Sequence, residues 1–128
     1  MKTNPVFFLL FLFLLFTACQ GSDAYQGQWH ATDRSGEKYT IDFTEHFFTV
    51  IDAHGDSVAH PYSQYSFNYE DGVTTFGIKL EDGRAYRIFF PLKNDTTKAL
   101  IQLEDQETHY TICRDSFLRY EDIYDLSH

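Results

Sequence analysis

Apolar and polar residues alternate along most of the chain after residue 25. In several short runs every second residue is aromatic or aliphatic, as in Tyr39, Ile41 and Phe43, and a period of two is typical of a strand with one buried face. Eight such runs follow one another, and they lie at 26–33, 37–43, 46–52, 62–70, 73–80, 84–92, 98–104 and 107–114. The pattern therefore predicts eight β-strands.

Turn-forming residues separate these runs. Asp71-Gly72 and Asp82-Gly83 are strong hairpin signals, because both positions of such a turn tolerate a positive φ. Short links of this kind predict that each strand pairs antiparallel with the next. A barrel leaves no strand edge exposed, whereas a two-layer sandwich, the alternative, only manages its edges. We therefore expect an all-β fold, an eight-stranded antiparallel up-and-down barrel.

The periodicity changes after Arg114. The apolar residues that follow are spaced for one face of a helix, and Asp115 or Ser116 is a suitable N-terminal cap. The residues on that face are Phe117, Tyr120, Ile123 and Tyr124. We expect a short C-terminal helix packed on the sheet.

The N-terminus differs from everything that follows. Val6 to Phe16 is an unbroken apolar run behind Lys2, and small residues come directly after it. A helix that spans a bilayer needs roughly 20 apolar residues, so the run is short for that alternative and fits a secretory signal peptide. We interpret residues 1–18 as a signal peptide.

The end of this leader, Phe16-Thr17-Ala18-Cys19, resembles the lipobox of bacterial lipoproteins. The resemblance implies cleavage before Cys19, lipidation of its thiol, and a membrane anchor made of several acyl chains, which holds a protein stably. Gln20 differs from the aspartate that retains such proteins in the inner membrane, so an outer-membrane location is favoured. Residues 19–25 are then the lipidated cysteine and a tether, and 26–128 are the barrel domain.

Charge narrows the choice of partners. The chain carries a net charge of −9, and residues 1–18 contain one lysine and no acid, so residues 19–128 carry −9 − 1 = −10. Nucleic acid binding needs lysine and arginine to neutralise phosphates, and this balance argues against it. It also argues against direct adsorption of the domain to an anionic membrane surface. With Cys19 lipidated, Cys113 is the one remaining thiol and no internal disulfide can form.

Gly27-Gln28-Trp29 stands at the start of the first expected strand. In that position a Gly-x-Trp motif resembles the opening signature of lipocalins, which also have eight up-and-down strands and a terminal helix. The chain is similar to the small lipocalin-like domains of bacterial lipoproteins. The resemblance implies a barrel that binds a small apolar molecule, such as a fatty acid or a haem-like ring.

The alternating pattern selects the side chains that face the barrel interior. They either line a ligand cavity or fill the barrel as its core, because an eight-stranded barrel is just wide enough for one or the other. The candidate ligand-binding residues are Trp29, Tyr39, Phe43, Tyr65, Phe67, Phe76, Tyr86, Ile88 and Phe90, with Ile41 and Ile78 between them.

Residue constellations for catalysis are weak. His109 and Cys113 lie four residues apart on one expected strand, about 13 Å at 3.3 Å per residue, too far for a base and its nucleophile. A buried structural thiol is the better interpretation of Cys113. His54, Asp56 and His60 lie close in sequence and fit either a metal-binding loop or a solvated one. We expect no enzyme activity, no cofactor and no metal site.

Two hypotheses for function follow. The first is a non-enzymatic lipoprotein of the outer membrane that binds a small apolar ligand in its barrel. The second is a protein-binding accessory of the cell envelope, such as an inhibitor or an assembly subunit, with a filled barrel and an acidic surface that meets a basic partner.

Overall fold

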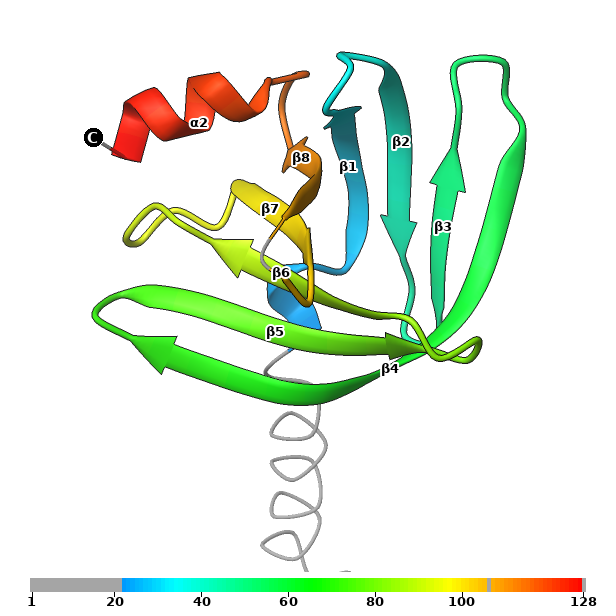
Figure 1. The fold of residues 1–128 in the computed structure, drawn as a ribbon, viewed down its shortest axis with the longest axis horizontal. Helices are drawn as coiled ribbons and strands as arrows, with labels where there is room; N and C mark the ends of the chain where they lie inside the picture. The colour runs from blue at the N-terminus through cyan, green and yellow to red at the C-terminus, as the bar shows by residue number, and fades with distance from the viewer. Residues whose placement is uncertain (1–21, 106, 128) are drawn as a thin grey trace, which may run out of the picture.

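The computed structural model describes residues 22–105 and 107–127, which form a closed barrel with one α-helix outside it (Figure 1). The elements are η1 (Ser22–Ala24), β1 (Gly27–Asp33), β2 (Lys38–Phe43), β3 (Phe47–Ile51), β4 (Ser57–Glu70), β5 (Val73–Leu80), β6 (Ala85–Phe90), β7 (Lys98–Leu103), β8 (Thr108–Cys113) and α2 (Tyr120–Ser127). Each strand pairs antiparallel with the next, and β8 pairs with β1. The expected up-and-down barrel is confirmed, and the sandwich alternative is wrong.

The hairpin turns have the backbone that their residues predict. Asp71 and Gly72 both have positive φ, 54° and 81°, as a tight Asp-Gly turn between β4 and β5 requires. Gly83 has a φ of 99° in the turn between β5 and β6. These local signals therefore set the register of two neighbouring hairpins.

Strand β4 is longer than the expected run at 62–70, because it begins at Ser57. Its first five residues pair with β3, and its later residues pair with β5. The change of partner occurs after Pro61, which has no backbone N–H for a ladder, while its carbonyl oxygen accepts from the Glu81 N–H at 2.9 Å. A proline within a run of strand-forming residues usually argues against a central strand. Here Pro61 lies where β4 changes its pairing partner from β3 to β5.

The barrel core contains the side chains that point inward from all eight strands, together with one residue that precedes them. Tyr25 is 1% exposed and belongs to this core, although residues 19–25 were expected to be a tether. The folded part of the chain therefore begins before Gln26. The leader 1–18 and Cys19 lie outside the described residues.

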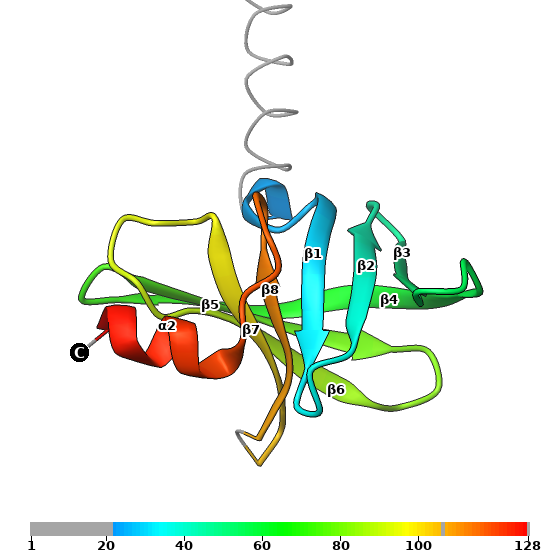
Figure 2. The same cartoon turned by 90° about the horizontal axis from the view of Figure 1, so that it is seen from above.

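A second, smaller buried layer lies outside the barrel, where α2 contacts β8 (Figure 2). Leu100 and Cys113 alternate with core residues, so they point outward, yet both are buried. Ile123 of α2 is buried as well. The thiol of Cys113 is therefore a packed structural group, as expected.

The C-terminal helix is confirmed, but its expected start is wrong. It begins at Tyr120, and the Arg119 N–H donates to the Asp122 carboxylate at 2.9 Å, so Asp115 and Ser116 do not cap it. Phe117, which was expected on the buried helical face, instead lies against the imidazole of His30. Tyr120 and Tyr124 are exposed. None of the described helices is long and apolar enough to cross a membrane.

Candidate functional site

The barrel interior was the expected ligand site, and most of the predicted lining residues point into it. Their side chains are almost completely buried and belong to one hydrophobic cluster. These residues are Trp29, Ile41, Phe43, Phe76, Ile78, Tyr86, Ile88 and Phe90. The alternation of apolar residues therefore identified the inward face of β1, β2, β5 and β6.

For two residues the prediction that they line the barrel interior is wrong. Tyr65 and Phe67 on β4 are 57% and 55% exposed. The register of β4 on β5 shifts between Gln64 and Ser66, so Tyr65 lies in an irregularity that the alternation does not predict. Phe67 pairs with Phe76 and shares its face, but it is exposed because it lies toward the projecting end of the β4–β5 hairpin (Figure 1). The ring of Phe67 contacts that of Phe76, with 5.3 Å between centroids, while more than half of the residue is exposed.

Tyr65 lies on the outside of the sheet, where Gly77 leaves room for it. A Cβ atom at Gly77 would come within 2.9 Å of the Tyr65 Cζ. The glycine therefore lets the tyrosine ring lie close to the strand. This contact turns Tyr65 away from the core that its place in the sequence predicted.

Rings in contact occupy the barrel interior. The rings of Phe43 and Phe48 stack with 5.0 Å between centroids, and those of Phe76 and Phe90 meet edge to face at 6.0 Å. The Trp29 and Phe90 rings lie 6.2 Å apart. Such distances are those of packed aromatic pairs. The aromatic side chains thus contact one another where a ligand was expected.

Tyr25 closes the end of the barrel from which β1 starts. Its ring packs edge to face on Phe43 and Phe76, with centroids 5.1 and 5.0 Å apart. Its hydroxyl donates to Gln64 Oε1 at 2.7 Å, and the neighbouring Tyr62 hydroxyl donates to the Thr44 carbonyl at 2.6 Å. Burial raises the pKa of both phenols, so they remain neutral donors.

Arg114 lies at the same end of the barrel as Tyr25. Its guanidinium carbon is 3.8 Å from the centre of the Trp29 ring, and its N–H groups donate to the carbonyls of Ala24, Gln26 and Gln28 at 3.3, 2.7 and 3.1 Å. Burial lowers the pKa of this guanidinium. One side chain therefore fixes both the N-terminal segment and the tryptophan. Sequence reasoning missed it, because no local pattern links residues so far apart.

Tyr39 marks the opposite end of the barrel, and it is only half-buried. Its hydroxyl donates to Asp33 Oδ2 at 2.9 Å. The other carboxylate oxygen of Asp33 accepts from the Ser35 N–H and hydroxyl and from the Glu37 N–H. Burial alone would raise the pKa of Asp33, but these hydrogen bonds outweigh it and lower the pKa. The predicted ligand residue Tyr39 thus belongs to a polar network around the turn.

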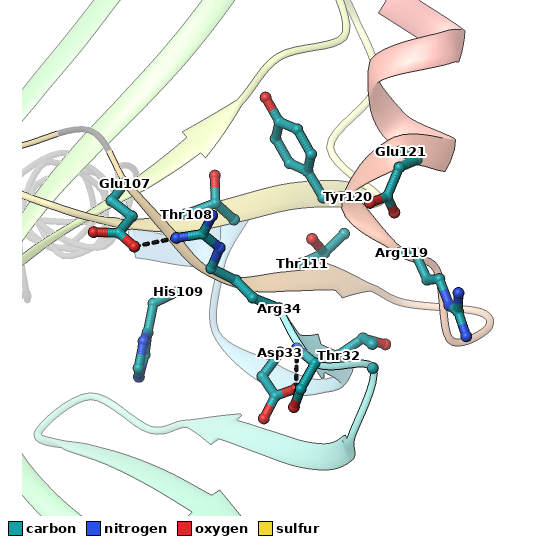
Figure 3. A pocket seen from close by; sticks show the side chains of 12 residues that line it. Thr32, Asp33, Arg34, Glu107, Thr108, His109, Thr111, Arg119, Tyr120 and Glu121 are labelled. Atoms are coloured by element: carbon teal, nitrogen blue, oxygen red, sulfur yellow. Dashed lines mark hydrogen bonds and ion pairs between the residues drawn. The ribbon is translucent and has the colours of Figure 1, made fainter.

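The described residues line surface cavities, of which we consider two. The smaller is lined by His60, Pro61 and the turn that follows β5. The larger has a volume of about 390 Å³ and lies between the β1–β2 turn, the β7–β8 hairpin and the start of α2 (Figure 3). Its lining is polar, and it contains none of the candidate ligand residues predicted from the sequence.

Catalytic and metal candidates do not come together. No group of three His, Cys, Asp or Glu side chains within residues 22–105 and 107–127 is arranged to hold a metal ion. His60 belongs to β4, while His54 and Asp56 lie in the turn before it. The His109 ring lies between those of Tyr86 and Tyr110, and burial lowers its pKa. The absence of enzyme activity stays a prediction.

Large apolar side chains are exposed at several places on the described surface, among them Phe47 on β3 and Val58 at the start of β4. Strand β4 exposes Tyr65, Phe67 and Tyr69, and α2 exposes Tyr124 and Leu126. Comparisons with protein-family models, with curated proteins and with solved structures find no match to this chain. The geometry of the chain is therefore the basis of the functional proposals that follow.

Proposed function

We propose that the protein is a lipid-anchored accessory of the bacterial cell envelope that binds another protein through exposed side chains at the end of its β4–β5 hairpin. The observation that carries this proposal is the division of the aromatic side chains. One set fills the barrel with rings in contact, and another set is exposed along β4. The barrel is then a rigid scaffold, and its outer surface makes the specific contacts.

The filled interior supports the scaffold role. An apolar ligand in the barrel would have to displace Phe43, Phe76 or Phe90, each at most 2% exposed. Interiors are close-packed, and shifting large core side chains costs free energy. A lipocalin-like ligand cavity therefore requires a rearrangement that a binding surface on the outside does not.

The projecting end of the β4–β5 hairpin supports the binding role (Figure 1). Phe67 and Tyr69 are two residues apart on β4 and share one face, and both are more than half exposed. Glu70 and Asp71 follow at the tip and are also exposed. We name these four residues the hairpin patch. Aromatic residues are enriched in protein interfaces, and tyrosine is a frequent contributor of binding energy.

The charge of the chain selects the partner class. Glu70 and Asp71 add two carboxylates to the hairpin patch of a protein with a net charge of −9. Complementary charges steer association and set specificity, so a partner with a basic surface is favoured. The proposed interaction thus combines aromatic contacts with salt-sensitive attraction.

The lipid anchor remains part of the proposal. Cys19 precedes Ser22 by three residues, which span at most about 11 Å when extended. Acyl chains on Cys19 would then hold η1 and the Tyr25 end of the barrel close to the outer membrane. Replacing Cys19 by serine is expected to move the protein from the membrane fraction to the soluble fraction, and retention in the membrane would contradict the anchor.

The binding role is tested by cross-linking in intact cells, followed by purification of the tagged full-length protein. Tyr69→Ser is expected to abolish recovery of a specific partner, since it removes a ring that is 62% exposed and lies in the hairpin patch. Phe47→Ser is the matched control, because Phe47 is an exposed aromatic residue at the start of β3, away from the hairpin tip.

The same experiment can be repeated at different salt concentrations as a second test. Recovery from detergent extracts should fall steeply as salt rises if the hairpin patch meets a basic surface. Equal recovery with both serine variants and at all salt concentrations would contradict the proposal. A small apolar molecule bound to the protein, with no protein partner, would favour the ligand-binding alternative.

A further inference from the structure

The larger surface cavity is separate from the hairpin patch, and its walls come from segments far apart in sequence. The β1–β2 turn contributes Arg34 and Ser35, the β7–β8 hairpin contributes Glu107 and Thr108, and the start of α2 contributes Tyr120. Figure 3 shows Arg34, Glu107, Thr108 and Tyr120 around this cavity. Its volume of about 390 Å³ lies at the lower end of the range for small-molecule sites.

A buried hydroxyl without a partner lines this cavity. Thr32 is 4% exposed and faces outward next to Thr111 of β8, which is also buried and also lines the cavity. Within the described part of the chain, Thr32 Oγ1 is the one buried side-chain polar atom that makes no hydrogen bond. A buried hydroxyl in that state costs roughly 1–3 kcal/mol, so a donor or acceptor from a ligand would stabilise it.

The charged groups of the cavity are of both signs. Arg34 is paired with Glu107, and the Asp33 carboxylate is occupied by its own turn. Arg119 and Glu121 make no ion pair with any described residue, and they lie on either side of Tyr120 in the sequence. The cavity thus offers one guanidinium, one carboxylate and one exposed aromatic ring to an incoming molecule.

This combination selects a class of ligand. Three carboxylates and two guanidiniums line the cavity. The excess of carboxylates disfavours an anionic ligand, and the two guanidiniums disfavour a cationic one. A neutral molecule with many hydroxyl groups can accept from Arg119, donate to Glu121 and exchange a hydrogen bond with Thr32. Tyr120 can pack on the apolar face of a sugar ring. We propose that the cavity binds a neutral saccharide of one or two rings.

The experiment uses the full-length protein as the cell produces it, solubilised in a detergent without sugar groups. Saturation-transfer NMR is recorded with glucose, N-acetylglucosamine and maltose. Thr32→Val keeps the shape of the side chain and removes its hydroxyl. For a sugar that shows transfer, the dissociation constant should rise roughly tenfold in this variant, the loss of one buried hydrogen bond. Its folding stability should stay equal or increase, because no hydrogen bond within the protein is lost.

Thr75→Val on β5 is the matched control, because Thr75 is a strand threonine that does not line the cavity. Its affinity for the sugar should equal that of the parent. Arg119→Gln, at a position outside every strand, should weaken binding without loss of stability. No transfer to any of the three sugars would overturn the proposal. Equal affinity in parent and Thr32→Val, or displacement of the sugar by inorganic phosphate, would overturn it too.

Discussion

Arg114 holds its guanidinium carbon 3.8 Å from the centre of the Trp29 ring, at the end of the barrel where the chain enters the fold. The same guanidinium donates to three backbone carbonyls, at Ala24, Gln26 and Gln28. The cation therefore joins the C-terminal end of β8 to the N-terminal segment that covers the core. The segment from Ala24 to Gln28 is thus held by a side chain from the far end of the domain.

Arg114→Lys is expected to destabilise the protein by about 1–3 kcal/mol, because an ammonium group cannot make the planar, forked set of hydrogen bonds over an indole ring. Chemical denaturation followed by tryptophan fluorescence measures the change. Arg87→Lys on the outer face of β6 is the matched control and should be nearly neutral. Equal effects of both substitutions would show that the Trp29 contact adds no stability.

Gly27 allows Arg114 to approach. Its φ is 98°, and a Cβ atom there would lie 3.1 Å from Arg114 Nη1. Gly83 has nearly the same φ, 99°, but nothing lies within 4 Å of its Cβ position. Alanine at either position should lower the free energy of unfolding by about 1–3 kcal/mol, because its backbone is strained at a positive φ. Gly27→Ala should be the less stable variant, because its Cβ also crowds Arg114. Thermal unfolding of the pair measures the difference, and equal midpoints would contradict crowding at Arg114.

The hydrogen bond from Tyr39 to Asp33 affects the stability of the fold at acid pH. The folded pKa of Asp33 lies below its usual value, so this carboxylate contributes stability above pH 4 that is lost as the pH falls through the folded pKa. Tyr39→Phe removes one of the hydrogen bonds that lower that pKa. The midpoint of acid unfolding, followed by circular dichroism, should therefore move to higher pH. Tyr69→Phe, on an exposed tyrosine, should leave the midpoint unchanged.

Local patterns in the sequence predicted the parts of the fold that depend on local physics. Alternation identified the buried face of β5, and Asp71-Gly72 identified a turn, since both follow from neighbouring residues. Tyr65 was misplaced, because a register shift in β4 has no signal in a single sequence. Phe67 lies opposite Phe76 as its place in the alternation implies, but the sequence does not show that the end of the β4–β5 hairpin projects and leaves this ring exposed (Figure 1). The contact of Arg114 with Trp29 could not be predicted either, because the two residues are far apart in the sequence.

The surface cavity lay beyond sequence reasoning for a different reason. Thr32 and Thr111 were each part of an expected strand, but only closure of the barrel brings them side by side. Their burial then depends on where the chain runs after Arg114, and the helix begins later than its apolar spacing suggested. Pairing of distant segments, rather than composition, creates this site.

Tyr25 provides a way to open the barrel. Its ring packs on Phe43, Tyr62 and Phe76, so Tyr25→Ala should cost about 3–5 kcal/mol and leave a cavity at the barrel end. The neutral fluorescent probe N-phenyl-1-naphthylamine should bind this variant at low temperature but not the parent. Tyr69→Ala, which removes an exposed ring, should behave like the parent. Strong probe binding by the parent would indicate an interior that already admits apolar molecules.

The central claim is that the barrel interior is a packed core and that the protein acts through its outer surface. Native mass spectrometry of the protein purified from its own cells, with solvent extraction of a denatured sample, tests it most directly. The account predicts the mass of the polypeptide with the lipid proposed for Cys19, and no apolar molecule released on denaturation. A stoichiometric apolar compound that is lost on denaturation and recovered in organic solvent would contradict it.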